Sequence, residues 1–323
     1  MKAFRYTVIL LLCAFAVAAV AGAQQTVAAA AQALQLWATA VVPALLPFFI
    51  ASQALLLMGC APACSRLLAP LMRFLGYPQS GAYALAVSML GGYPGGAKAV
   101  SELLEQGAVS QKEAGRLSIL CHTSGPLFVM GTAAGVLLKQ PQWGFSMLIC
   151  HYCACFCTAA LFAFRQKSSS GEAGPITKGQ ALSVGAVMGQ SVMAGINTML
   201  LICGYMVFFG VVIALLPLPD GNMGAVLAGM LEMTNGIAHL AGSQAMPLAC
   251  ALLSFSGVCI NLQALTLLGK ACNPLQFISA RLICAVFAYA LAALFQAWGN
   301  ILYSVACAAA FISACRLFGK MFA

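Results

Sequence analysis

The sequence predicts an all-α, polytopic membrane protein, built as an inverted repeat with re-entrant hairpins and broken transmembrane helices. Three observations predict this class. Hydrophobic residues make up 63% of the 323 residues and charged residues only 7%, whereas soluble domains carry about 25% charged residues. Apolar runs long enough to span a bilayer recur along the chain. Glycine, proline and polar residues interrupt several of these runs at what would be membrane depth.

The distribution of charge predicts the topology. The net charge of +9 comes from lysines and arginines that lie in short clusters between the apolar runs, as the positive-inside rule expects. We therefore expect a lipid membrane, and no nucleic acid, as the large-scale partner. Both termini are predicted to be cytoplasmic, and Lys139 and Asp220 to lie outside.

The chain is predicted to divide into three parts. Residues 1–165 would form a first membrane repeat with an N-terminal helix, 166–180 a cytoplasmic linker, and 181–323 a second membrane repeat. The linker, QKSSSGEAGPITKGQ, is the only clearly soluble-looking stretch of the sequence. Residues 1–23 have the basic start, apolar run and AGA of a signal peptide, but the length of the run favours a retained helix.

The two halves are expected to contain similar elements. The first would hold a span at 6–23, an interfacial stretch up to Trp37, a span at 43–59, a hairpin at 81–107, a helix broken at 122–126, and a span at 143–164. The second would hold an amphipathic stretch at 181–195, a span at 196–216, a hairpin at 224–242, a span at 247–268 interrupted at 254–263, and spans at 277–296 and 301–318. Discontinuous helices in matching places are typical of secondary transporters. The run at 224–242 could also cross the membrane once. Ser110 to Glu113 form a capping box, which predicts a helix start.

The cysteines are expected to act as small hydrophobic residues rather than as ligands. The tightest cluster holds Cys150, Cys153, Cys155 and Cys157, with His151 among them. One helix cannot easily surround a metal ion with ligands from different faces. We therefore expect no metal, and a helix rich in small residues.

Two charged residues are the strongest site candidates. A helix that begins at Gly96 would point its positive end at the preceding break, and Lys98 in its first turn would attract an anion. The alternative is that Lys98 reaches to the interface. Glu232, the only acid deep in an apolar run, needs a partner. That partner would be Lys98, as a structural ion pair or a transport device, or a coupling H⁺ or Na⁺ held with Thr234 and Asn235.

Neutral polar residues at the breaks are the remaining candidates. Ser124, Ser256, Asn261 and Gln263 could bind a ligand, or could instead satisfy the backbone of the broken helices. His239, close to the end of its apolar run, is expected at the interface. The breaks at 91–96, 122–126, 232–236 and 256–261 are predicted to meet in one cavity.

Four motifs carry a family resemblance. Residues 92–98, GYPGGAK, resemble the G-Y-P-x-G-A-K signature of the YlbJ family of sporulation integral membrane proteins, which have nucleoside recognition or Gate domains. Residues 121–128, CHTSGPLF, are similar to the family's C-N-N-S-x-P-L-F stretch, and 232–236, EMTNG, to its E-x-T-x-G segment. SFSG, followed by Gln263, resembles its S-F-G-G-x-S-x-x-x-Q segment.

The resemblance implies a fold like that of concentrative nucleoside transporters. For the best-known members it also implies movement of dipicolinic acid toward the developing spore. His122 and Thr123 stand where asparagines are usual, Ser256 replaces a glycine, Cys259 a serine and Asn261 a histidine. These departures bear on the substrate more than on the fold.

We therefore predict a secondary-transporter-like membrane protein that moves a small anionic or aromatic metabolite, with dipicolinate as one candidate and H⁺ or Na⁺ as the coupling ion. The alternative is a non-transporting Gate-domain component that assembles with partner membrane proteins. We expect no enzyme activity, catalytic residue or cofactor, and we count a homo-oligomer among the candidate assemblies. The predicted substrate-binding residues are Gly92, Tyr93, Gly95, Gly96, Lys98, His122, Thr123, Ser124, Glu232, Thr234, Asn235, Ser256, Asn261 and Gln263.

Overall fold

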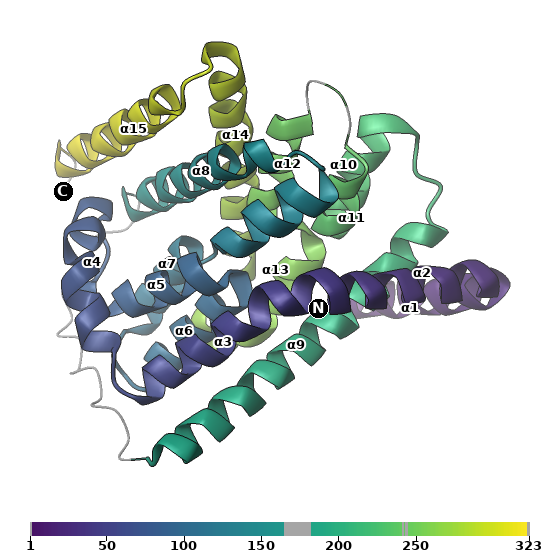
Figure 1. Cartoon of the computed structure of the whole chain (residues 1–323), viewed down its shortest axis with the longest axis horizontal. Helices are drawn as coiled ribbons and strands as arrows, with labels where there is room; N and C mark the ends of the chain where they lie inside the picture. Colours follow the sequence, from purple (N-terminus) through teal and green to yellow (C-terminus); the bar gives the residue numbers. More distant parts are fainter. Residues whose placement is uncertain (1, 165–181, 241, 243–244, 322–323) are drawn as a thin grey trace.

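The computed structural model describes residues 2–164, 182–240, 242 and 245–321, and within them all regular secondary structure is helical (Figure 1). Among these residues five helical stretches are long and apolar enough to cross a membrane: Ala23–Leu57, Pro141–Ala163, Val184–Leu215, Ala245–Ala271 and Pro274–Trp298. The predicted class, an all-α polytopic membrane protein, is confirmed. The expected linker at 166–180 lies outside the described residues.

The first long helical rod differs from the prediction. Helix α1 (Lys2–Ala21) is followed by α2 (Ala23–Leu36), a π-helical turn (Trp37–Val41) and α3 (Val42–Leu57). The last three form one continuous rod. The prediction of an interfacial stretch followed by a separate span was therefore wrong. Pro43 takes the second position of α3, where its missing N–H costs little, and the π-turn before it absorbs the irregularity.

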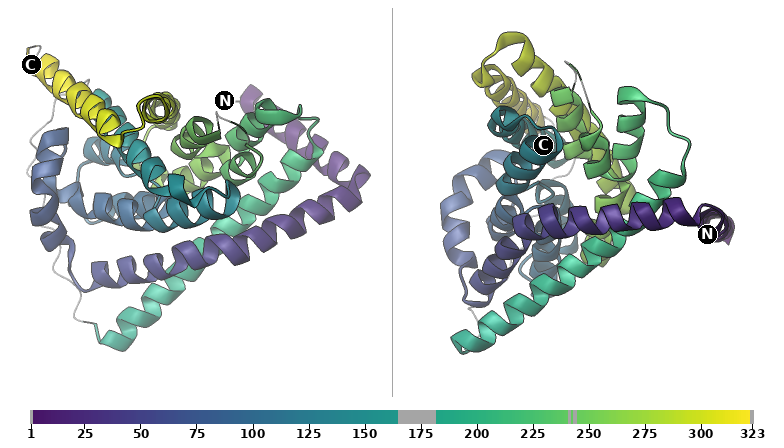
Figure 2. Two further views of the ribbon diagram at one scale, coloured as in Figure 1. Left: turned by 45° about the horizontal axis from the view of Figure 1, so that its top comes forward. Right: turned by 45° about the vertical axis from the view of Figure 1, so that its right-hand side comes forward.

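A second rod, α9 (Val184–Leu215), replaces the amphipathic stretch and span that were expected in the second half. Ser183 caps its start by accepting a hydrogen bond from the Ala186 backbone N–H over 3.3 Å. The two rods pack against each other and cross along the lower edge of the left view in Figure 2. The Trp37 indole N–H donates to the Met199 carbonyl over 3.0 Å, which ties the rods together.

The first hairpin consists of α5 (Ala82–Gly91) and α6 (Tyr93–Glu105), which fold against each other. The reversal takes place at Gly92, whose φ of 92° is a backbone conformation that favours glycine.

Helix α6 starts earlier than the sequence analysis expects. It begins at Tyr93, not Gly96, because Pro94 occupies the second helical position, where proline is favoured. Lys98 therefore lies in the second turn of α6 and not in the first.

The second hairpin consists of α10 (Gly221–Leu231) and α11 (Met233–Ala238), joined at Glu232. The two helices are in close contact, so this run does not cross the membrane as one straight helix. Gly236 of α11 rests on Gly229 of α10, where an added Cβ would lie 2.5 Å from the Gly229 nitrogen.

Two spans are broken. Helix α7 (Gln111–Leu120) starts at the predicted capping box, in which the Ser110 N–H donates to the Glu113 carboxylate over 2.8 Å. The chain then leaves helical structure and resumes as the π-helix Phe128–Leu137. In the second half, α12 (Ala245–Phe255) and α13 (Gly257–Leu268) are separated by Ser256 alone.

The remaining elements close the fold. Helix α8 (Gly144–Phe164) packs against α14 (Pro274–Trp298) and α15 (Ile301–Met321), and α12 packs against α14. Each half thus contains a rod, a hairpin, a broken span and a closing helix, and closing helices of the two halves are in contact. These elements are α4 (Ala61–Leu75), α8 (Gly144–Phe164), α14 (Pro274–Trp298), α15 (Ile301–Met321) and 3-10 turns at Gln79–Gly81, Pro141–Trp143 and Gly269–Ala271.

The close approach of α10 and α11 predicts a large effect of one methyl group. Gly236→Ala should destabilise the protein by about 1–3 kcal/mol, because the added Cβ overlaps backbone that cannot move freely. Gly204→Ala on α9 is the matched control, since nothing lies within 4 Å of its Cβ position. Thermal unfolding in detergent, followed with a dye that labels newly exposed cysteines, measures both. Equal melting temperatures would contradict the hairpin packing.

Candidate functional site

The first hairpin is hydrogen-bonded to the first broken span. The Ser88 hydroxyl accepts from the Thr123 backbone N–H over 3.0 Å and lies 2.9 Å from the Thr123 hydroxyl. Nearby, a Cβ on Gly125 would come within 2.6 Å of the Leu90 carbonyl oxygen. The two breaks therefore approach closely enough to require glycine at this point.

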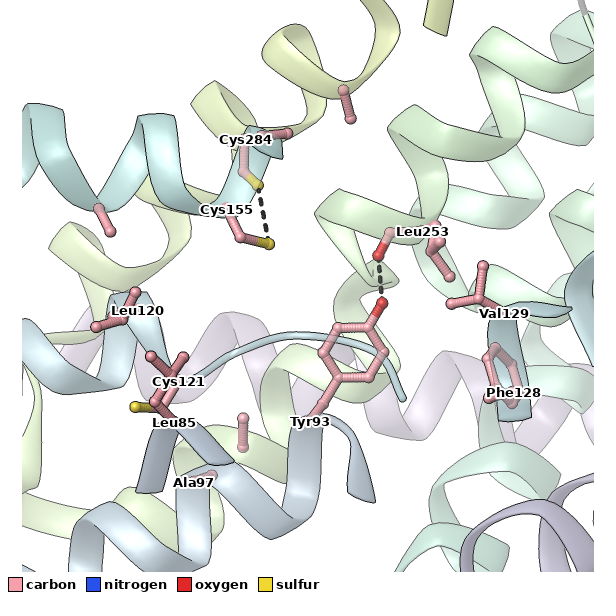
Figure 3. Close-up of a cluster of buried hydrophobic side chains, with 14 of the residues drawn as sticks. Leu85, Tyr93, Ala97, Leu120, Cys121, Phe128, Val129, Cys155, Leu253 and Cys284 are labelled. Atoms are coloured by element: carbon pink, nitrogen blue, oxygen red, sulfur yellow. Dashed lines mark hydrogen bonds between the residues drawn. The ribbon is translucent and has the colours of Figure 1, made fainter. Parts of the chain in front are cut away.

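The first half is also bonded to the broken span of the second half. The Tyr93 hydroxyl donates to the Leu253 carbonyl over 2.5 Å, as Figure 3 shows. His122 Nε2 lies 2.9 Å from the Ser256 hydroxyl, which in turn is 3.2 Å from Asn261 Oδ1. These contacts join breaks that are more than a hundred residues apart in the sequence.

The second hairpin packs against the second broken span. A Cβ on Gly257, beside the break at Ser256, would lie 3.0 Å from the Gly229 carbonyl oxygen and 3.1 Å from the Met233 nitrogen. The turn of this hairpin thus rests on the second broken span. All four breaks lie together, as predicted, while their part in binding a substrate stays a prediction.

A central cavity of about 40 Å³ lies among the breaks. One water needs at least about 10–15 Å³ on this measure, so the cavity holds only a few waters and must widen to admit a metabolite. Six of the predicted residues line it: Gly92, Tyr93, Ser124, Glu232, Thr234 and Gln263. The other lining residues are Val41, Leu45, Pro94, Phe128, Ile202, Met206, Met233 and Ile260.

The other predicted residues take different places. Gly95 and Lys98 line a neighbouring cavity, and Asn235 lines a third. His122, Thr123, Ser256 and Asn261 connect the breaks and are absent from the central lining. At Gly96, an added Cβ would lie 2.6 Å from the Ser88 hydroxyl oxygen, so that position serves close packing.

Glu232 is buried, with 1% of its surface exposed, and caps the start of α11. Its carboxylate accepts hydrogen bonds from the backbone N–H groups of Thr234 (3.1 Å) and Asn235 (2.9 Å). The Asn235 side-chain amide (2.9 Å) and the Thr234 hydroxyl donate as well. Four donors and the positive end of a helix stabilise a buried carboxylate without a cation partner.

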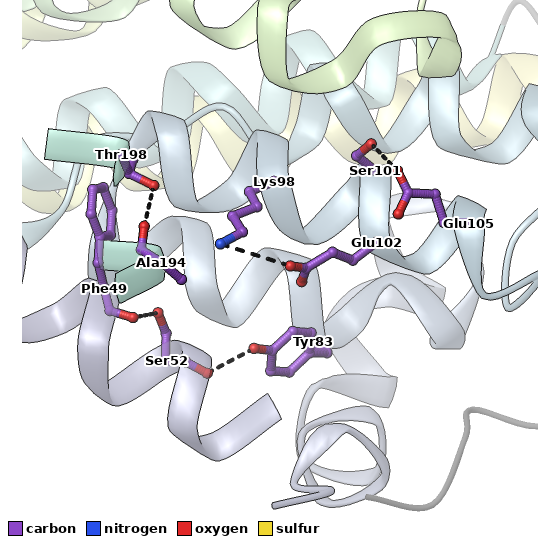
Figure 4. A network of polar contacts seen from close by, with 9 residues as sticks. All are labelled: Phe49, Ser52, Tyr83, Lys98, Ser101, Glu102, Glu105, Ala194 and Thr198. Atoms are coloured by element: carbon purple, nitrogen blue, oxygen red, sulfur yellow. Dashed lines mark hydrogen bonds and ion pairs between the residues drawn. The ribbon is translucent and has the colours of Figure 1, made fainter. Parts of the chain in front are cut away.

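Lys98 is not the partner of Glu232, which corrects the ion pair considered from the sequence. Its ammonium nitrogen lies 4.0 Å from Glu102, one turn further along α6, as Figure 4 shows. The early start of α6 turns Lys98 toward α3 and α9, where it shares a cavity with Ser52 and Thr198. A half-exposed pair of this kind contributes little to stability.

Two buried residues of the site escaped the sequence analysis. His151 accepts from the Ser124 backbone N–H at Nε2 over 2.9 Å, and its Nδ1 lies 2.8 Å from the Ser254 hydroxyl. Arg281, on α14, donates to the carbonyls of Ile119 (2.8 Å) and His122 (3.0 Å), at the end of α7. The available signal was a histidine and an arginine inside apolar runs.

Three cavities follow one another along α9. The residues that α9 contributes recur every three or four positions and so share a stripe of the helix. Pro94 lines both the central and the second cavity, and Met206 and Thr234 line both the central and the third. Along α9 the stripe consists of Ala194, Gly195 and Thr198 at the second cavity, Ile202 and Met206 at the central one, and Met206, Gly210, Ile213 and Ala214 at the third.

The row of cavities has the length of a bilayer and is wide at one end. Ala194 and Ala214 are about 30 Å apart along an ideal helix, which equals the hydrocarbon thickness of a typical membrane. The second cavity measures about 20 Å³ and the third about 500 Å³. The third shares His239 with a further cavity of about 270 Å³ that reaches Asp220.

The fold and the site define a multi-pass helical membrane protein whose two halves meet through broken helices around a cavity. A curated relative from Bacillus subtilis (strain 168), the sporulation integral membrane protein YlbJ, is 26% identical over 300 residues, covering 79% of this chain and 74% of the relative. The chain is therefore similar to a YlbJ protein over most of its length, in agreement with the resemblance that its motifs predicted. No family model matches the chain, and no solved structure gives a significant match.

The hydrogen bond between His151 and Ser254 joins the two halves, so its removal should lower the stability of the protein measurably. Ser254→Ala leaves a buried imidazole nitrogen without its partner, which should cost about 1–3 kcal/mol. Ser118→Ala is the matched control, because that buried hydroxyl donates to the Gly115 carbonyl of its own helix and has no buried imidazole as its partner. Thermal unfolding in detergent compares the two variants. A loss no larger for Ser254→Ala than for Ser118→Ala would show that this bond does not hold the halves together.

Proposed function

We propose that the protein is a secondary transporter for a small anionic or aromatic metabolite, with dipicolinate as the first candidate. The observation that carries the proposal is the row of linked cavities along one face of α9, over the thickness of a bilayer. A protein with a purely scaffolding role has no need of such a row. The narrow central cavity lies between the second and third cavities and separates the two ends of the row, as alternating access requires.

The chemistry of the central cavity favours a small ring compound. Its walls are mostly apolar and include the rings of Tyr93 and Phe128. Ser124, Thr234 and Gln263 add a few polar groups, the usual composition of a small-molecule site. The name of the relative refers to sporulation, which makes a metabolite of sporulation the first compound to test.

Glu232 is the proposed site of coupling to H⁺ or Na⁺. It is a carboxylate in the wall of the central cavity, and Thr234 and Asn235 supply further oxygen ligands or hydrogen bonds. Ionisable residues at such depth are typically parts of ion or proton pathways. Binding of a cation would rearrange the four donors that now hold the carboxylate, and so would change the second hairpin.

Transport itself is tested with the purified protein in liposomes. The assay follows uptake of radiolabelled dipicolinate and, separately, of uridine, under an imposed pH or Na⁺ gradient. Gradient-dependent uptake above protein-free liposomes is expected for at least one compound. Uptake of neither compound, with correctly folded protein, would favour the alternative of a Gate-domain component that assembles with other membrane proteins.

A bulky residue in the central cavity should block uptake. Ile202→Trp places an indole where the cavity measures about 40 Å³, and uptake should fall at least about tenfold. Leu200→Trp, an exposed position on the same helix, is the control and should transport like the wild type. If Ile202→Trp is folded and transports normally, the route does not follow the α9 stripe.

Glu232→Gln should uncouple transport from the gradient. The amide keeps the shape of the side chain but cannot bind a proton or a cation as the carboxylate does. We expect binding of the substrate to persist while accumulation against a gradient is lost. Glu105→Gln, an exposed position on α6, is the control. Full gradient dependence in the Glu232→Gln variant would remove Glu232 from the coupling mechanism.

A further inference from the structure

Arg281 is a buried positive charge that lacks an acidic partner in the described part of the chain. Its side chain is completely buried within α14, and the ion pair found among the described residues joins Lys98 to Glu102. A full charge in the interior of a membrane protein costs several kcal/mol, and such residues usually have a function.

The hydrogen bonds of Arg281 to the backbone do not by themselves require a charge. Its guanidinium also lies over the Phe277 ring at 5.7 Å and interacts with the thiols of Cys155 and Cys284, but none of these groups is an acid that would neutralise it. Its two terminal nitrogens donate to the backbone carbonyls of Ile119 and His122, a task that a neutral amide could also perform. Its Nε has no hydrogen-bond partner among the described residues. The negative end of α7 offsets roughly half an elementary charge. A substantial positive field therefore remains at the break of the first broken span, residues 122–126.

That field extends into the central cavity. Arg281 interacts electrostatically with Tyr93, whose ring lines the cavity, and with His122 and His151. Tyr93 contacts both imidazoles, with ring centroids 4.7 Å from His122 and 6.2 Å from His151. Charges buried in protein are screened far less than charges in water. The acid in the cavity wall, Glu232, already has four donors of its own.

We propose that Arg281 gives the central cavity its preference for an anionic substrate, acting through its field and without touching the substrate. The inference rests on the proposed function and deepens it, because it selects an anion over a neutral aromatic compound. It also assigns to Arg281 the role that the sequence analysis gave to Lys98, which lies in the second cavity. A coupling cation would then bind at Glu232, away from the break at 122–126.

The test compares a charged probe with a neutral one of the same shape. The affinities of pyridine-2,6-dicarboxylate and of its diamide are measured by calorimetry on the purified protein in detergent. The wild type should prefer the dicarboxylate. Arg281→Gln keeps hydrogen-bond donors but loses the charge, so its affinity for the dicarboxylate should fall at least about tenfold while that for the diamide stays constant. Arg281→Lys keeps the charge and should keep the preference.

Arg116 provides the matched control. It is a second buried arginine that donates to a backbone carbonyl, that of Gly76, and it lies over the Tyr77 ring at 4.8 Å. Arg116→Gln should lower stability without changing the preference for the dicarboxylate.

Four results would overturn the inference. If Arg281→Gln binds both probes equally more weakly, Arg281 only holds the break in place. If Arg281→Gln cannot be purified folded, Arg281→Lys decides, because loss of preference in that variant would exclude a role of charge alone. If the wild type binds the diamide as tightly as the dicarboxylate, the inference fails while the transport proposal stands. Binding of neither probe, together with no uptake in liposomes, would reject both.

Discussion

The need to pair backbone groups at the helix breaks governs the rest of this structure. Away from water, every unpaired N–H or C=O is costly, and four interrupted helices expose many of them. The protein satisfies these groups with side chains from neighbouring helices and from other breaks. Ser88 accepts from the Thr123 N–H, and His151 accepts from the Ser124 N–H. The Tyr93 hydroxyl donates to the Leu253 carbonyl. The breaks are thus held by contacts between elements far apart in the sequence as well as by groups close to each break.

This arrangement separates the charges of the site in a definite way. Glu232 is held by donors from its own hairpin, and Lys98 is paired along its own helix. Of these three charged residues, Arg281 is the one that reaches across from another element to a break. The central cavity is therefore shaped mainly by neutral side chains. The charge of Glu232 in its wall is compensated by hydrogen-bond donors, whereas that of Arg281, behind the break at 122–126, is compensated only in part. Such a cavity can remain closed without direct contact between opposite charges.

Local patterns in the sequence were enough to predict the helical class, the two hairpins and the broken spans. Glycine, proline and the capping box at Ser110 act on their own neighbourhood, and their effects can be read there. The start of α6 was misjudged because Pro94 both interrupts a helix and favours a helix start. The roles of His151 and Arg281 could not be predicted, because their partners lie far away in the sequence: Arg281 is 162 residues from Ile119. A one-dimensional pattern contains no record of such contacts.

The contact between His122, Ser256 and Asn261 bears on two of the departures from the family motifs that this chain resembles. In the motifs of the family, an asparagine is usual at the first of these positions and a histidine at the last, whereas this chain has them exchanged. The structure places both side chains against the same serine hydroxyl. The exchange is therefore reciprocal: one imidazole and one amide are retained, each contributed by the opposite half of the molecule. Either substitution alone, His122→Asn or Asn261→His, would put two amides or two imidazoles against one hydroxyl, whereas the double exchange would keep one of each.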